Sequence, residues 1–324
     1  MTGHMRSIVI VLLVLVSSLF AQQVTDRPHI LGIAHVGIYV NDLNSTRAFY
    51  KDFLGFGEPF SLKHEDGTEW IVYIKINELQ YIELFAERRR SGGPLGHFSL
   101  YTDSLERTKD YLESRGVEPV DNIHAGRTGN RFFTIKDPDG HTVEITQYEP
   151  GSWTTETRGN FLPAGRVSGH ILHVGLRATS MEATERFYRD VLGFRVFTDT
   201  VSFPKQRGWV TLRVPDGDDY VELIPYTASR WAESQALQDH FCLAVSDAKK
   251  VVADLQLRGK DESASLAREI DVEVGDHEEW QVSMFDPSGT RIELREPTKP
   301  ARKQDPPQAT TSASLPAGGT KKKE

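Results

Sequence analysis

Four copies of one pattern of apolar and polar positions fill the middle of the chain. Each copy begins with a strand, continues into a helical segment that ends at a glycine, and closes with two or three strands of alternating polarity. The repeat is clearest in two blocks: residues 33–37 recur as 171–175, and residues 48–56 recur as 186–194. Both pairs are displaced by 138 residues, and two blocks at one offset indicate an internal duplication.

A weaker copy lies inside each half, at residues 96–100 and 239–243. We expect each of the four strands to lead into a helix with a polar residue at its start and a glycine at its end. The expected starts are Asp42, Asp103, Ser180 and Ser246, and the expected ends are Gly55, Gly116, Gly193 and Gly259. Residues 137–140 and 286–289 share the pattern Asp-Pro-x-Gly, which is typical of a tight turn before a strand.

The two ends of the chain lack this pattern. Residues 8–16 form an apolar run between Arg6 and a group of small residues, which is typical of a secretory signal peptide; an uncleaved anchor is the alternative. Residues 297–324 are rich in Pro, Ala, Thr and Lys and are expected to form a disordered tail. We therefore predict a signal peptide at 1–21, domains at 29–150 and 167–296 joined by a linker at 151–166, and export to the periplasm or the extracellular space.

Composition narrows the function classes. The chain has 324 residues, a formal net charge of −8 and one cysteine, Cys242. The acidic balance disfavours a basic surface for nucleic acid, and the single cysteine excludes an intramolecular disulfide and a cysteine-rich zinc site. We expect a small-molecule substrate, no nucleic-acid partner, no stable membrane span after signal cleavage, and a monomer or a homodimer.

A histidine opens each copy and a glutamate closes it. The histidines are His35, His97, His173 and His240, and Glu83, Glu144, Glu222 and Glu293 follow them after 48, 47, 49 and 53 residues. Because strand side chains alternate between faces, all eight are expected on the face opposite the apolar one. A single histidine or glutamate in a strand is usually structural, but eight matched positions indicate a metal site. Nitrogen and oxygen ligands without a thiolate suit Zn, Ni, Mn or Fe(II).

Further residues share this face or lie near it. Arg291 and Arg295 flank Glu293 at two-residue spacing and could clamp an anionic substrate group, although an exposed charge at a strand edge is the simpler interpretation. Cys242 lies beside His240 on the metal-facing side and is interpreted as a packed small residue. His124 and His277 precede the Asp-Pro turns, either as proton donors or as exposed loop histidines.

These motifs together resemble the vicinal oxygen chelate superfamily, which includes glyoxalase I, bleomycin resistance proteins and extradiol dioxygenases. The resemblance rests on the His-Val-Gly strands, the Phe-Tyr-x-Asp-x-Leu-Gly-Phe helix ends and the Asp-Pro-x-Gly turns followed by glutamate. It implies an α+β fold of four βαβββ modules paired into two domains, each a curved mixed sheet with helices on its outer face around a metal cup. It also implies ligand sets of His35, Glu83, His97 and Glu144, and of His173, Glu222, His240 and Glu293.

Three functions compete at this stage. The resemblance favours a metal-dependent lyase or isomerase of glyoxalase type, in which a substrate with neighbouring oxygens forms a metal-stabilised enolate and Glu144 or Glu293 moves a proton. An extradiol dioxygenase with Fe(II) would use His173, His240 and Glu293, but Thr134 and Ser283 replace the tyrosine that often precedes the turn. A non-catalytic binding or resistance protein is the third, and the retained ligand positions argue against it. The sequence leaves open which metal binds, whether both cups work and how the modules pair.

Overall fold

The computed structural model describes residues 26–87, 93–197, 209–226, 239–259, 270–274 and 280–297. The predicted signal peptide, all of the predicted tail after residue 297, and His277 lie outside the described residues. The first half contains β1 (Gly32–Tyr39), α2 (Leu43–Ala48), η1 (Phe49–Phe53, a π-helical turn), β2 (Gly57–Lys63), β3 (Glu69–Lys75), β4 (Tyr81–Phe85), β5 (Leu95–Tyr101), α3 (Leu105–Ser114), β6 (His124–Ala125), β7 (Arg131–Lys136), β8 (Thr142–Gln147) and α4 (Trp153–Glu156). The second half contains β9 (Ile171–Ala178), α5 (Met181–Arg186), η2 (Phe187–Val191), β10 (Arg195–Val196), β11 (Val210–Arg213), β12 (Tyr220–Pro225), β13 (His240–Ala244), α6 (Ala248–Arg258), β14 (Ile270–Val274), β15 (Trp280–Phe285) and β16 (Arg291–Arg295).

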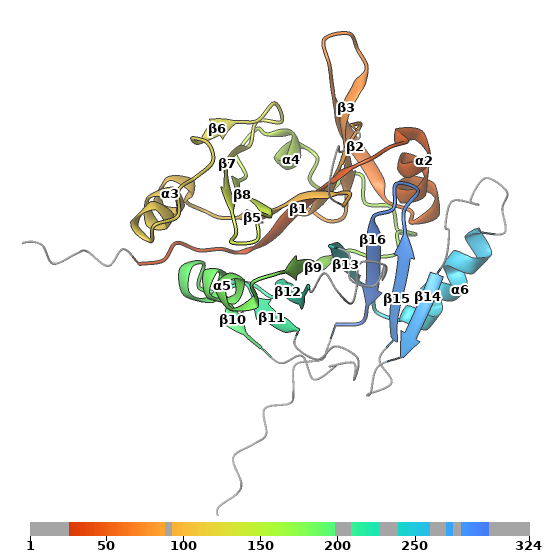
Figure 1. The fold of residues 1–324 in the computed structure, drawn as a ribbon. Coiled ribbons are helices and arrows are strands. Elements are labelled where there is room, and N and C mark those ends of the chain that lie inside the picture. The colour runs from red at the N-terminus through yellow and green to blue at the C-terminus, as the bar shows by residue number, and fades with distance from the viewer. Residues whose placement is uncertain are drawn as a thin grey trace, which may run out of the picture.

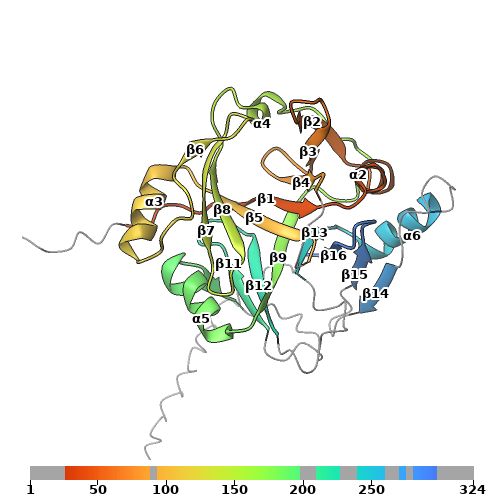
Figure 2. The same cartoon turned by 45° about the horizontal axis from the view of Figure 1, so that its top comes forward.

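Each half forms one eight-stranded mixed sheet (Figure 1). The strand orders are β2-β3-β4-β1-β5-β8-β7-β6 and β10-β11-β12-β9-β13-β16-β15-β14. The first strands of the two modules, β1 and β5, are antiparallel neighbours at the centre, and β9 and β13 take the same places in the second sheet. The modules therefore pair within each half. The predicted α+β fold is confirmed, and in Figure 2 the first sheet curls so that its edge strands β2 and β6 both turn toward α4.

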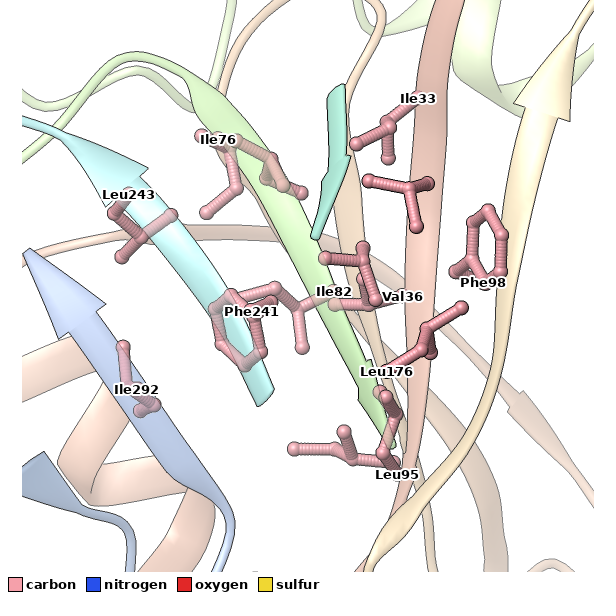
Figure 3. Close-up of a cluster of buried hydrophobic side chains, with 14 of the residues drawn as sticks. Ile33, Val36, Ile76, Ile82, Leu95, Phe98, Leu176, Phe241, Leu243 and Ile292 are labelled. Atoms are coloured by element: carbon pink, nitrogen blue, oxygen red, sulfur yellow. The ribbon is translucent and has the colours of Figure 1, made fainter. Parts of the chain in front are cut away.

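The apolar faces of the two sheets pack against each other. One continuous hydrophobic core contains buried residues of both halves, and β1 contacts β9 directly. Figure 3 shows Ile33, Val36 and Phe98 of the first sheet near Leu176 and Phe241 of the second. We expected helices to cover these faces, but the opposite sheet shares that role. As a consequence, the polar faces with the histidines and glutamates point away from each other.

The repeated helix ends connect the two halves. Tyr50 of η1 donates a hydrogen bond to the buried carboxylate of Asp286, in the Asp-Pro turn of the second half, at 3.1 Å. Tyr188 of η2 makes the equivalent 3.1 Å bond to Asp137 in the turn of the first half. The Phe-Tyr and Asp-Pro motifs therefore act as a reciprocal pair of contacts between the halves, in addition to forming local turns.

The predicted helix ends are correct in part. Asp42 caps α2 and its side chain accepts from Ser45 N at 3.2 Å, but α3 and α6 begin one residue later than expected, with Ser104 and Asp247 as caps. Ser180 precedes α5 without a side-chain capping bond, and Asp139 of the first half accepts from Thr179 N beside it at 2.9 Å. The predicted glycines take the left-handed conformation at 55, 116 and 193, with φ of 77–80°, whereas Gly259 has φ of −68°.

Several elements lie where the sequence pattern is weak. Strand β2 contains Pro59 and only two apolar side chains at two-residue spacing, Phe60 and Leu62, and α4 is a single turn inside the predicted linker. This linker is anchored by Lys75, whose buried ammonium donates to Thr157 O at 2.6 Å and to Asn160 O at 3.1 Å. The predicted domain limits remain predictions. In the described part of the chain, no helix is long and apolar enough to cross a membrane.

Two candidate metal centres

A glycine in each opening strand makes room for the second histidine. Gly37 lies opposite His97 in the β1–β5 pairing, two residues after His35 and on the same face. A Cβ atom at position 37 would lie 2.1 Å from His97 Cε1, and a Cβ at Gly175 would lie 2.1 Å from His240 Cε1. Only glycine lets the imidazole ring lie against the neighbouring strand, which explains the His-Val-Gly spacing in both halves.

The first centre brings the four predicted residues of the first half together. His35 Nε2 and His97 Nε2 lie 3.1 Å apart, and Glu83 lies 3.8 Å from the former and 3.6 Å from the latter. Two ligands at roughly 2.0–2.1 Å from one ion, at right angles to tetrahedral angles, are roughly 2.8–3.4 Å apart. The spacing of the two imidazole nitrogens therefore fits one divalent ion, and the Glu83 oxygens would have to move slightly closer to bind the same ion. The ligand role of these residues remains a prediction.

Glu144 occupies a distinct position in this centre. The ligand-type atoms of His35, Glu83 and His97 all lie within 4.8 Å of one another, and Glu144 joins them through its 3.4 Å approach to His35 Nε2. The same Glu144 oxygen accepts hydrogen bonds from Ser99 Oγ at 3.2 Å and from the Thr146 hydroxyl. Hydroxyl groups therefore orient this carboxylate without neutralising it.

In the first centre, attraction between the histidines and Glu83 shifts the pKa values of His97 and Glu83. Burial alone would lower the pKa of His97, but the hydrogen bond and charge of Glu83 outweigh it and raise that pKa. Burial likewise opposes the charged form of Glu83, whereas the nearby His35 and His97 lower its pKa. A centre with two carboxylates thus favours positive charge, which a divalent cation would supply.

A cavity of about 420 Å³ opens directly onto the first centre. The four centre residues line it together with six aromatic side chains: Trp70, Tyr73, Tyr81, Phe85, Phe132 and Tyr148. The lining also includes His124 and Arg127, both exposed, and Thr154 of α4. The size and the apolar lining match sites for small organic ligands.

The second centre repeats the convergence with closer burial. His173 Nε2 and His240 Nε2 lie 3.3 Å apart, and Glu293 approaches them at 3.5 and 3.4 Å. Glu222 lies 3.5 Å from His173. The four side chains are 0–7% exposed, against 10–14% in the first centre. All eight predicted residues are thus brought together in two sets, each within one half.

Two arginines distinguish the second centre from the first. The expectation of exposed strand-edge charges is wrong, because the side chains of Arg291 and Arg295 are 6% and 5% exposed. Arg291 forms an ion pair with Glu293 and donates to His240 Nδ1 at 3.1 Å, and Arg295 pairs with Glu222 at 3.3 Å. Although burial opposes ionisation, the charge of Arg291 and hydrogen bonding with His173 and His240 hold the pKa of Glu293 well below its usual range. The sequence shows that both arginines face the cup, but only packing shows that they are buried.

Comparison with known proteins identifies the family of this chain. The sequence model of one family, the Glyoxalase/Bleomycin resistance protein/Dioxygenase superfamily, matches residues 32–145 and 170–294. Glyoxalase I of Saccharomyces cerevisiae is 27% identical over 135 residues, which are 42% of this chain and 36% of that protein. An iron-dependent extradiol dioxygenase of Rhodococcus jostii is 35% identical over 109 residues, 32% of this chain and 35% of its own.

A solved structure shows the same fold over most of the chain. The Mn(II)-bound glyoxalase from Novosphingobium aromaticivorans superposes with a TM-score of 0.60 at 18% identity, covering 83% of each chain. The family match covers both repeats and hence most of the described chain. The protein therefore belongs to the Glyoxalase/Bleomycin resistance protein/Dioxygenase superfamily.

Proposed function

We propose that this protein is a metal-dependent enzyme whose first cup converts a small substrate with two neighbouring oxygens, by lyase or isomerase chemistry of glyoxalase type. The observation that carries the proposal is the convergence of His35, Glu83, His97 and Glu144 in the lining of the 420 Å³ cavity. A substrate in this cavity would place its oxygens beside the imidazoles and its remainder against the aromatic side chains of the lining.

The residues of the cup would divide the work. His35, His97 and Glu83 would hold a divalent ion, which when bound polarises the substrate oxygens and stabilises negative charge on them. Glu144 would take a proton from the carbon next to a carbonyl and return it to the neighbouring atom. The hydroxyls of Ser99 and Thr146 both donate to one oxygen of this carboxylate and hold it in place.

A specific observation favours a second candidate, an extradiol ring-cleaving dioxygenase with Fe(II). His124 lines the cavity, and its Nδ1 lies 2.8 Å from Asn122 O. The centroids of the His124 and Phe132 rings lie 4.1 Å apart. An imidazole that lines the same cavity could serve as an acid–base group for an aromatic substrate, which the aromatic side chains of the lining suit. The 35% identity to the Rhodococcus dioxygenase supports the same candidate.

One set of assays separates these functions. The protein is freed of metal with a chelator, reloaded with Mn, Fe(II), Ni or Zn, and incubated in D₂O with α-hydroxycarbonyl compounds and with hemithioacetals of 2-oxoaldehydes. We expect metal-dependent deuterium incorporation or isomerisation that falls by about 10²–10⁴-fold in Glu144→Gln. The control is Glu182→Gln, a change at a side chain that is 79% exposed on α5.

Other outcomes would contradict the proposal. Oxygen uptake with a catechol and Fe(II) would favour the dioxygenase, and metal-independent ligand binding without turnover would identify a binding protein.

We also propose export, which rests on the N-terminal sequence alone. The intact mass of the protein recovered from the exported fraction tests removal of residues 1–21.

A further inference from the structure

The second centre carries its own positive charges. In the pairing of β13 with β16, Arg291 lies opposite His240 and Arg295 lies opposite Ala244. In the equivalent pairing of β5 with β8, Thr142 lies opposite His97 and Thr146 lies opposite Tyr101. The two centres therefore differ at equivalent positions: threonine in the first cup, arginine in the second. We propose that the guanidinium groups of Arg291 and Arg295 take the place of a divalent ion in the second cup, so that the chain has one metal centre instead of two.

Charge balance supports this assignment. With neutral imidazoles, the two glutamates of the second cup carry two negative charges, and the arginines paired with them cancel both. Among the described residues of this cup, a divalent ion would add two positive charges to a set that the printed ion pairs already balance, and these side chains are at most 7% exposed, where repulsion is poorly screened. In the first cup, Thr142 and Thr146 leave both glutamate charges for an ion to neutralise.

The tautomer of His240 provides a second, independent argument. Arginine is a donor only, so the 3.1 Å contact between Arg291 Nη1 and His240 Nδ1 requires that Nδ1 accept the bond. A neutral imidazole with Nδ1 as acceptor carries its proton on Nε2. This Nε2 is the atom that faces His173 and Glu293, at 3.3 and 3.4 Å, and a protonated nitrogen cannot bind a metal.

Metal-bound histidines show the opposite arrangement. The nitrogen that does not bind the metal normally donates its proton to a carboxylate or a carbonyl, which frees the other nitrogen to act as ligand. Arg291 imposes the reverse on His240. The second centre would thus act as a closed ion-pair cluster, although the spacing of its nitrogens also fits a metal.

The test counts metal ions in the folded, full chain. After chelation and dialysis against Mn(II) alone or Zn(II) alone, elemental analysis should give about one ion per chain. We expect this ion to be lost in His35→Ala/Glu83→Gln and kept in His240→Gln. In Arg291→Thr/Arg295→Thr, which copies the first cup, the count should rise to about two.

The reciprocal variant Thr142→Arg/Thr146→Arg should lose the ion of the first cup, with circular dichroism confirming the fold of each variant. Two ions in the unaltered chain would overturn the inference, as would an ion lost in His240→Gln but kept in His35→Ala/Glu83→Gln. A chain without any ion would refute the proposed function, and the arginine double variant would still decide this inference: a gained ion supports it and none overturns it.

Discussion

At the residue scale, the alternation of side chains along a strand predicts the face to which each side chain points, but not whether it is buried. It places the two histidines and two glutamates of each half on one face of their sheet, and the structure agrees. It also places Arg291 and Arg295 on that face, yet the sequence favours an exposed position for them. Their burial depends on partners from other strands, Glu222 and His240, whose approach no local pattern encodes.

Gly37 offers a prediction at this scale. A methyl group there would overlap the ring of His97, so Gly37→Ala should displace the imidazole. Displacing one ligand should weaken metal binding about 10- to 100-fold, as outer-shell changes do. A competition titration with a chromogenic chelator measures the affinity.

The matched control is Gly175→Ala, which crowds His240 in the same way. It should destabilise the fold but leave the metal content unchanged, because the second cup is expected to hold no ion. An equal loss of metal in both variants would contradict the role given to His97.

At the element scale, the sequence predicts which segments form helices and turns but not what they contact. The helical pattern ending at Gly55 and the Asp-Pro turn at residues 286–289 are visible as local signals. Their meeting at the Tyr50–Asp286 hydrogen bond joins residues 236 positions apart, and a local period carries no information at that distance. The single turn α4 escapes prediction because four residues are too few to show a period.

The Asp286 carboxyl gives this contact a pH dependence. Burial raises its pKa from 3.8 to about 6, despite hydrogen bonds from Thr290, Ser288 and Tyr50 that favour the charged form. Between these values the folded protein binds more protons than the unfolded chain does. The free energy of unfolding should therefore fall as the pH rises from 4 to 6, by up to about 3 kcal/mol from this group.

Urea unfolding between pH 4 and 7 measures this effect. Asp286→Asn keeps the acceptor oxygen and cannot titrate, so the difference between the two stability curves isolates the carboxyl. We expect that difference to change over pH 4–6 and to level off above it. A constant difference across the range would show that Asp286 is already ionised at pH 4.

At the scale of the whole molecule, the repeat predicts two similar halves, and the core shows that they depend on each other. Each sheet covers the apolar face of the other, and buried polar groups bridge them: Gln80 of the first half accepts from Ile171 N at 2.7 Å, and Asp219 of the second accepts from Ile33 N at 2.7 Å. The sequence shows that the faces are apolar but not what covers them.

The shared core predicts a single unfolding transition. If either half separated, residues such as Ile33 and Leu176, both buried in the common core, would be exposed to water. Scanning calorimetry should therefore give one peak whose calorimetric and van't Hoff enthalpies agree. Residues 26–166 expressed alone should aggregate, and two resolved peaks in the full chain would contradict this expectation.

The reciprocal tyrosine–aspartate contacts bear on how the two cups came to differ. The contact is self-complementary: Tyr50 meets Asp286 as Tyr188 meets Asp137, which is the geometry of a two-fold symmetric dimer written into one polypeptide. In a dimer of identical subunits, every substitution occurs in both active sites at once. Joining the copies removes that constraint, so Arg291 and Arg295 can alter one cup while Thr142 and Thr146 persist in the other. In a single fused chain, a substitution in one half therefore leaves the equivalent position of the other half unchanged.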